Sequence, residues 1–216
     1  YEKPKLLSKY LTEVKNVINL RKHKIKATFK DNSLSLIGSG KIQLEKEYDD
    51  IDYSISQSGD KVNIDSNIKL SGLNIKSQKN LKTFFPKINE VLNLKDHQIN
   101  IKFKDNSLSL IGSGKIQLEK EYDDIDYSIS QSGDKVNFDT KFIISKTQFE
   151  VERINFSNDG KSKLQLEVSG NHIRKNDLSI DKLLITTKND KLGMNNLLVD
   201  KYHRIVKFDE ISLNYF

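Results

Sequence analysis

Residues 29–63 read FKDNSLSLIGSGKIQLEKEYDDIDYSISQSGDKVN, and residues 103–137 repeat this stretch without a single difference. The offset between the two copies is 74 positions (103 − 29). A shared fold requires matching core and turn residues, but it does not require that exposed Lys, Glu, Asp and Ser match as well. The copy therefore reflects a recent duplication at the gene level or an error of sequence assembly. It indicates a chain built from repeating units that stack.

The repeated unit extends upstream of the identical stretch. Residues 8–29 (SKYLTEVKNVINLRKHKIKATF) align with residues 82–103 (KTFFPKINEVLNLKDHQINIKF), so that His23 falls on His97. Similarity fades soon after the downstream end of the identical stretch. Each unit is therefore expected to be a helix followed by several strands.

Two amphipathic helices are expected, one at the start of each unit. The first spans Lys5–Leu20, where apolar residues recur every three to four positions. The second lies near residues 81–92, and Pro86 shortens it or places its start near Phe85. The apolar faces carry Leu7, Tyr10, Leu11, Val14, Val17 and Ile18 in the first helix, and Leu81, Phe84, Phe85, Ile88, Val91 and Leu92 in the second. Each helix is expected to pack on a sheet, and lying on a membrane surface is the alternative.

The rest of the chain alternates apolar and polar residues with a period of two, which is typical of strands with one buried and one wet face. Turn signals separate these strands, for example Asp31-Asn32-Ser33 and Ser58-Gly59-Asp60. Gly38 and Gly40 take the apolar phase, where glycine lets a strand bend or lets another backbone approach. We predict a mainly β chain with two short helices, folded as a long antiparallel meander that forms a curved, groove-like repeat sheet.

Three segments are expected within the 216 residues, which correspond to one large β domain or two coupled units. Residues 1–80 form the first helix-plus-strands unit, and residues 81–145 form the second. Residues 146–216 continue the meander of the same groove without returning to a helix.

Composition favours a thin sheet over a thick core. Hydrophobic residues make up 36% of the chain, and even with its 10 Gly added the apolar share stays below the roughly 45–50% usual for globular domains. The net charge of +6 is spread without a dense Lys/Arg run, which indicates a solvated surface. The absence of Cys excludes disulfides, thiolate catalysis and cysteine zinc sites.

Targeting signals are also missing from the sequence. No stretch approaches the roughly 18 apolar residues of a membrane span, and no signal peptide is recognisable. The chain opens with Tyr1 rather than Met, so we expect a fragment of a longer protein whose anchor or targeting segment lies outside these residues.

No motif predicts catalysis, a cofactor or a metal. Gly38–Lys41 resembles a phosphate loop only superficially, because the spacing is wrong and an apolar strand continues after it. The acidic cluster at residues 45–52 lacks the alternating oxygens and glycine of a calcium loop. The histidines show no metal-ligand spacing, and His23 and His97 are expected just after the helices. Aromatic residues share the apolar phase and do not interleave with basic ones, so no nucleic-acid partner is expected.

Three stretches carry a resemblance to a known family. They are GSGKIQLEKEYDDIDYSI (38–55), VNFDTKFIISKTQFEVERINFSNDGKSKLQLEVSG (136–170) and LSIDKLLITTKNDKLGMNNLLVDKYHRIVKFDEISLNY (178–215). Their short LxLxGSGK strands, LxLxGxxxxxxxLxIDxLxL pairs and closing VxFDxIxLxY resemble the AsmA-like superfamily, most of all the large envelope proteins of the YhdP/TamB type in Gram-negative bacteria. The likeness covers residues 24–216, and the identical 35-residue copy departs from that family's divergent repeats.

The resemblance implies a non-enzymatic role in lipid transport and outer membrane biogenesis. Members of the superfamily are anchored in the inner membrane, cross the periplasm and offer an apolar β-groove to phospholipids. The partners implied are phospholipid acyl chains, the inner membrane through segments outside this fragment, and other envelope proteins. The resemblance carries over no catalytic residues, cofactors or metals.

The leading hypothesis is a segment of a periplasmic protein that transfers phospholipid between the inner and outer membranes. The alternatives are a structural or interaction β-repeat module of the cell envelope with no ligand, and a scaffold that recruits a partner by strand addition. The predicted lipid-groove residues are the apolar-phase positions of both copies: Phe29, Leu34, Leu36, Ile42, Leu44, Ile51, Tyr53, Ile55, Val62, Ile64, Phe103, Leu108, Leu110, Ile116, Leu118, Ile125, Tyr127, Ile129, Val136 and Phe138.

Overall fold

The computed structural model describes residues 19–77, 79–151, 156–173, 178–200 and 205–214. The first expected helix lies outside these residues except for its last two, Asn19 and Leu20. Those two residues belong to a strand, so the helix does not reach the end that the periodicity predicted.

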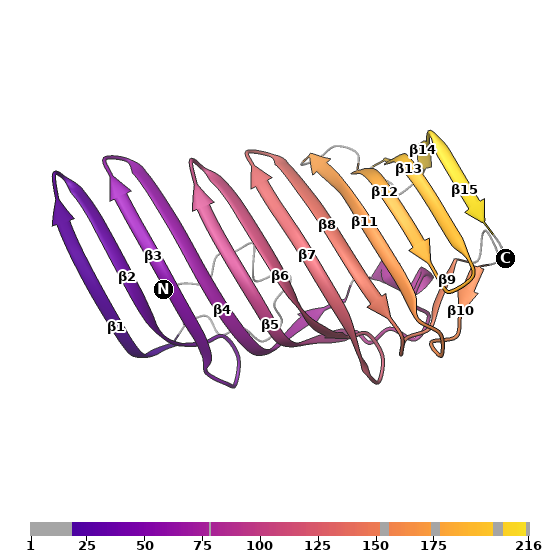
Figure 1. Cartoon of the computed structure of the whole chain (residues 1–216), viewed down its shortest axis with the longest axis horizontal. Coiled ribbons are helices and arrows are strands. Elements are labelled where there is room, and N and C mark those ends of the chain that lie inside the picture. The colour runs from indigo at the N-terminus through magenta and orange to yellow at the C-terminus, as the bar shows by residue number, and fades with distance from the viewer. Residues whose placement is uncertain (1–18, 78, 152–155, 174–177, 201–204, 215–216) are drawn as a thin grey trace.

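The described residues are mainly β-strand (Figure 1). The elements in chain order are β1 (Asn19–Lys30), β2 (Ser33–Gln43), β3 (Asp49–Ser58), β4 (Lys61–Lys76), the 3-10 helix η1 (Lys79–Thr83), β5 (Val91–Lys104), β6 (Ser107–Gln117), β7 (Tyr122–Ser132), β8 (Lys135–Ile144), β9 (Phe149–Val151), β10 (Phe156–Asn158), β11 (Leu164–Ile173), β12 (Leu178–Thr186), β13 (Lys191–Val199), β14 (Ile205–Lys207) and β15 (Glu210–Asn214).

One open, 13-stranded antiparallel sheet contains every strand except the small β9–β10 hairpin. Neighbouring strands follow chain order from β1 to β8, after which β11, β12 and β13 continue the meander. Strand β13 pairs with both β14 and β15, so β1 lies at one end of the sheet and these short strands lie at the other (Figure 1). The prediction of a mainly β, long antiparallel meander is confirmed.

The duplicated sequence appears as duplicated structure. Strands β1 to β4 correspond to β5 to β8, and the pairing registers agree at the 74-residue offset, as for Leu36↔Ile55 and Leu110↔Ile129. The two-residue turns at Asp31-Asn32 and Asp105-Asn106 both have positive φ, which suits the right-handed twist of a hairpin.

The second predicted helix is wrong. Residues 79–83 form a single 3-10 turn, and Val91 and Leu92 already belong to strand β5. Between them the chain makes isolated turn hydrogen bonds, such as that from the Ile88 N–H to the Phe85 carbonyl (3.0 Å). The helix-like spacing of apolar residues arises because this segment lies across the sheet and buries Phe85 and Ile88 against it. Pro86 also prevents a continuous helical hydrogen-bond ladder.

Strands β1 and β5 each contain a β-bulge, which corrects the expected position of the two histidines. Lys22 and Asp96 both have φ of 53°, and the register with the next strand shifts by one residue at each site. The bulge brings His23 and His97 onto the apolar face of the sheet, inside a strand rather than after a helix.

The core lies at one end of the apolar face. Residues 79–90 and the β9–β10 hairpin form a partial second layer there, over the ends of the strands opposite the Asp31-Asn32 and Asp105-Asn106 turns. The rings of Phe85 and Phe156 pack edge-on against Phe149, with centroids 5.3 Å and 6.3 Å away. The buried cluster comprises Phe85, Ile88, Leu92, Ile116, Leu118, Ile125, Ile144, Phe149, Phe156, Leu164, Leu166, Ile185 and Leu192.

Candidate functional site

A band of apolar side chains crosses strands β1 to β8 near the Asp31-Asn32 and Asp105-Asn106 turns. Directly paired residues in an antiparallel sheet point to the same face, so the register defines the band. Phe29 pairs with Leu34, and Ile64 pairs with Phe103, which pairs in turn with Leu108. We call this set the apolar band: Phe29, Leu34, Leu36, Ile55, Val62, Ile64, Phe103, Leu108, Leu110, Ile129, Val136 and Phe138.

Every side chain of the apolar band retains exposed surface. Phe29 is 71% exposed, Ile129 40% and Leu108 38%, and the others are half-buried. A contiguous apolar surface of this kind is unusual on a soluble protein and commonly marks an interaction site. All twelve residues belong to the predicted lipid groove.

The remaining predicted groove residues lie closer to the partial second layer or under it. Ile116, Leu118 and Ile125 are buried and belong to the core cluster, so the protein's own side chains cover them. Ile42 is buried as well, whereas Leu44, Ile51, Tyr53 and Tyr127 are half-buried. The structure thus brings together twelve of the predicted residues as an accessible band and separates the other eight from it.

Aromatic rings fill the places that glycines leave open on the apolar face. A Cβ added at Gly38 or Gly112 would lie closer than 3.0 Å to the ring of Tyr53 or Tyr127, and one at Gly40 or Gly114 would meet His23 or His97 in the same way. These glycines therefore accommodate rings of the same chain, and not another backbone. The ring-filled strip lies between the apolar band and the buried core.

The His97 ring makes two hydrogen bonds that one neutral tautomer satisfies. Its Nε2 lies 2.9 Å from the Lys115 carbonyl, which can only accept, so Nε2 carries the proton. Nδ1 is then free to accept from the Tyr127 hydroxyl at 3.2 Å. Burial lowers the pKa of His97 below 6.5, against the opposing effects of the Lys115 carbonyl and Asp96. Burial also raises the pKa of Tyr127 to about 12.

The acidic cluster of each copy anchors loops. Asp123 is 2% exposed, and its carboxylate accepts hydrogen bonds from the Ser145 N–H (2.7 Å), the Lys146 N–H (3.1 Å) and the Thr147 hydroxyl (2.5 Å). In the first copy, Asp49 accepts from the N–H and hydroxyl of Ser71. Asp49 thus holds β4 just beyond its last pair with β3, and Asp123 holds the chain where it leaves β8.

Other acidic residues of the cluster have equally structural partners. Glu119 accepts from the Gln148 N–H at 3.0 Å, and Asp124 forms an ion pair with Lys115 at 2.9 Å. The hydrogen bond to Asp124 raises the pKa of Lys115. Within the described ranges, no three His, Cys, Asp or Glu residues lie close enough to hold a metal ion.

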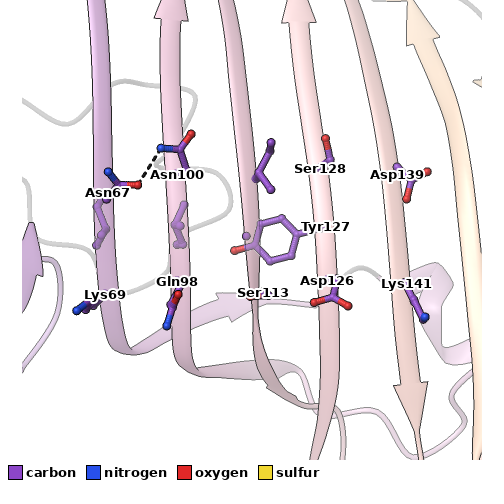
Figure 2. Close-up of a pocket in the computed structure, with 14 residues that line it drawn as sticks. Asn67, Lys69, Gln98, Asn100, Ser113, Asp126, Tyr127, Ser128, Asp139 and Lys141 are labelled. Carbon is purple, nitrogen blue, oxygen red and sulfur yellow. Dashed lines mark hydrogen bonds between the residues drawn. The ribbon is translucent and has the colours of Figure 1, made fainter. Parts of the chain in front are cut away.

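The opposite face of the sheet is polar and contains two shallow hollows that are repeats of each other. One hollow, of about 620 Å³, lies over β4 to β8, and the other, of about 600 Å³, lies over β1 to β4. Figure 2 shows the first, where Asn100 donates to Asn67 (2.8 Å). Two cross-strand rows line it, namely Asn67, Asn100, Ile111, Ser128 and Asp139, and Lys69, Gln98, Ser113, Asp126 and Lys141.

Sequence reasoning missed the pairing of ring and glycine on the apolar face. The signal was present, because Gly38 and Gly40 share a phase with Tyr53 and the histidine recurs at the same offset. The contact between ring and glycine could not be predicted, because the β-bulge that moves the histidine onto that face was not predicted. Ile37 and Ile111 were also missed, and both are exposed in the middle of the polar face.

No family model, curated protein or solved structure matches this chain. The part of the chain that the structure describes contains no helix with the length and hydrophobicity needed to cross a bilayer. What bears on function is therefore the geometry of the apolar and polar faces of the sheet.

Proposed function

We propose that this chain is a segment of a periplasmic AsmA-like protein whose apolar band carries phospholipid acyl chains between the inner and outer membranes. One observation supports this proposal above the others. The apolar band continues across eight neighbouring strands with exposed surface at each step. In this proposal the sheet curves into a groove, and an inner-membrane anchor lies outside these residues.

The energetics of lipid movement favour such a continuous surface. Each methylene transferred from hydrocarbon to water costs about 0.8 kcal/mol, so exposing both acyl chains costs on the order of 20 kcal/mol. A carrier must therefore offer apolar contact at every position along the path. Cross-strand pairs, together with one step along β2 and one along β6, connect Phe29 to Phe138 and provide contacts at the spacing between strands, which is about 4.8 Å.

The test compares matched charge substitutions on the two faces of the same strands. Ile55→Asp with Ile129→Asp places two carboxylates in the apolar band, and Ser54→Asp with Ser128→Asp places them one residue away on the polar face. Ile125 is unsuitable because it belongs to the buried core. The measurement is transfer of fluorescent phospholipid between phosphatidylethanolamine–phosphatidylglycerol vesicles, with circular dichroism confirming that each variant is folded.

The proposal predicts that the intact chain transfers lipid and that only the isoleucine double variant loses transfer. Mass spectrometry of the purified chain should also find co-bound phospholipid. Absence of both transfer and bound lipid in the intact chain contradicts the proposal, as does equal loss of transfer in both folded variants.

A structural or interaction module of the cell envelope with no ligand is the second candidate. The partial second layer favours it, because that layer already covers Ile116, Leu118 and Ile125 with side chains of the same chain. This candidate predicts no bound lipid, and it predicts that the isoleucine variant differs from the serine variant only in stability.

A further inference from the structure

The outer edge of β1 is a long strand edge with which no described residue pairs. Strand β1 is twelve residues long and hydrogen-bonds to β2 on its inner side only (Figure 1). An exposed edge presents a row of backbone N–H and C=O groups, which is a template for another strand. Such an edge is either protected against pairing or available to a further strand.

The duplication supplies a direct comparison, because β5 is the repeat equivalent of β1 and is paired on both sides. Strand β4 occupies the edge of β5 that corresponds to the outer edge of β1, with a register running from Ile64↔Phe103 to Lys76↔Val91. A strand with the apolar phase of β4 therefore fits the shape of the β1 edge.

Apolar side chains along β1 lack the cover that their equivalents receive from β4. Leu20 and Ile25 are 62% and 60% exposed, and Phe29 is exposed still further. Their equivalents in β5 are half-buried, as the same residues are expected to be when a strand lies beside them. The exposure along β1 matches the loss of one neighbouring strand.

The bulge in β1 does not block strand addition. Bulges commonly protect edges by twisting them away from partners. The equivalent bulge of β5 lies at Asp96 and His97. Strand β4 still pairs with β5 there, through Gly72↔Lys95 before Asp96 and Leu70↔His97 after it. The β1 bulge has the same φ and the same register shift.

The polar side of β1 determines the charge of the strand that fits. Lys24 and Lys26 replace Gln98 and Asn100 of β5, which lie opposite Lys69 and Asn67 of β4. A strand with carboxylates at these two positions would form two cross-strand pairs with the lysines. A second β1 would instead bring lysine against lysine, which disfavours symmetric self-pairing.

We propose that the outer edge of β1 binds an acidic, extended segment of a partner protein by antiparallel strand addition. The segment has the apolar phase of β4, so its apolar residues lie beside Phe29, Ile25 and His23. It has Asp or Glu opposite Lys24 and Lys26. This inference does not depend on lipid binding, because it rests on the sheet edge and the proposed function rests on a sheet face.

A peptide taken from β4 tests the proposal. The probe is residues 61–76 (KVNIDSNIKLSGLNIK) with Asn67→Asp and Lys69→Glu, carrying a fluorophore at one end. Fluorescence anisotropy with the intact chain measures affinity, and NMR hydrogen exchange locates the binding strand. The acidic peptide should bind about tenfold more tightly than the unmodified peptide, because two cross-strand charge pairs are gained. It should slow exchange of the β1 amides.

Two controls make the outcome decisive. Lys24→Glu with Lys26→Glu should abolish the preference for the acidic peptide, whereas Lys104→Glu with Lys135→Glu changes net charge equally and should not. A peptide in which the apolar residues are moved to the alternate positions should not bind. No binding, binding without protection of β1, or self-association of the chain through β1 would each overturn the proposal.

Discussion

At the scale of single residues, a histidine ring and a tyrosine ring pack over two glycines in each copy. The copies differ in their surroundings and not in these residues: His97 is 1% exposed, whereas His23 is half-buried. The neutral, Nε2-protonated ring satisfies both of its partners, and protonation would leave the Tyr127 hydroxyl facing an N–H donor. These two hydrogen bonds therefore favour the neutral form of His97 over the protonated form.

His97 predicts a pH dependence of folding. The pKa of His97 is lowered in the folded chain, so the unfolded chain takes up the proton first as the pH falls through about 6.5. The free energy of unfolding should fall below that pH and level off below the folded pKa. Urea denaturation between about pH 4.5 and about pH 8.5, roughly two units on either side of 6.5, measures this slope. His97→Gln should reduce the slope, and an unchanged slope in that variant would contradict the assignment.

At the scale of elements, the 79–90 segment and the β9–β10 hairpin cover one part of the apolar face and leave the rest accessible. The Glu150 N–H donates to the Phe84 carbonyl (2.9 Å), and the Asn89 N–H donates to the Leu118 carbonyl (2.8 Å), so both pieces are tied to each other or to the sheet. Phe149 is the residue that both pieces share, because its ring packs against Phe84, Phe85 and Phe156.

Phe149→Ala should destabilise the chain by about 3–5 kcal/mol, the usual cost of emptying a buried phenylalanine site. The matched control is Phe29→Ala on the exposed end of β1, which should change stability by no more than about 0.5 kcal/mol. Urea denaturation monitored by circular dichroism gives both values. Similar costs for the two variants would mean that the second layer does not hold the core together.

Most strands and their order could be predicted from the sequence, because alternation with a period of two and Asp-Asn or Gly-Asp turns fix each hairpin locally. The departure of β9 and β10 from the main sheet could not be predicted in this way. The segment around Phe84 and Ile88 could not either, because a chain crossing a sheet buries residues at the same three-to-four spacing as a helix. Ile125 and Ile129 show the corresponding limit for the candidate site. They have the same apolar phase, yet only the buried residue belongs to the core cluster, which includes side chains of the non-local second layer.

At the scale of the whole molecule, buried residues are unevenly distributed between the two copies of the repeated unit. The core cluster draws on β5 to β8 and β11 to β13, whereas the buried apolar side chains of β1 to β4 are Ile42, Ile68 and Leu70. Local stability follows buried apolar contact, so the first copy should open more readily than the second.

Hydrogen exchange measures this difference with an internal reference. Residues 33–43 and 107–117 have the same sequence and so the same intrinsic exchange rates. Amides of β6 should exchange at least about tenfold more slowly than those of β2, which corresponds to about 1.4 kcal/mol. The measurement requires NMR, because identical segments give peptides that mass spectrometry cannot tell apart. Equal protection would show that the sheet opens as one unit.

The duplicated unit contributes four strands, which is an even number. The strand that follows the unit consequently runs in the same direction as the unit's first strand. Each later strand therefore meets the same neighbour in the same orientation. Adding or removing one unit therefore lengthens or shortens the chain by 74 residues without inverting any later strand. A chain with one unit more or one unit fewer would keep the same sheet architecture, because each unit adds two complete hairpins.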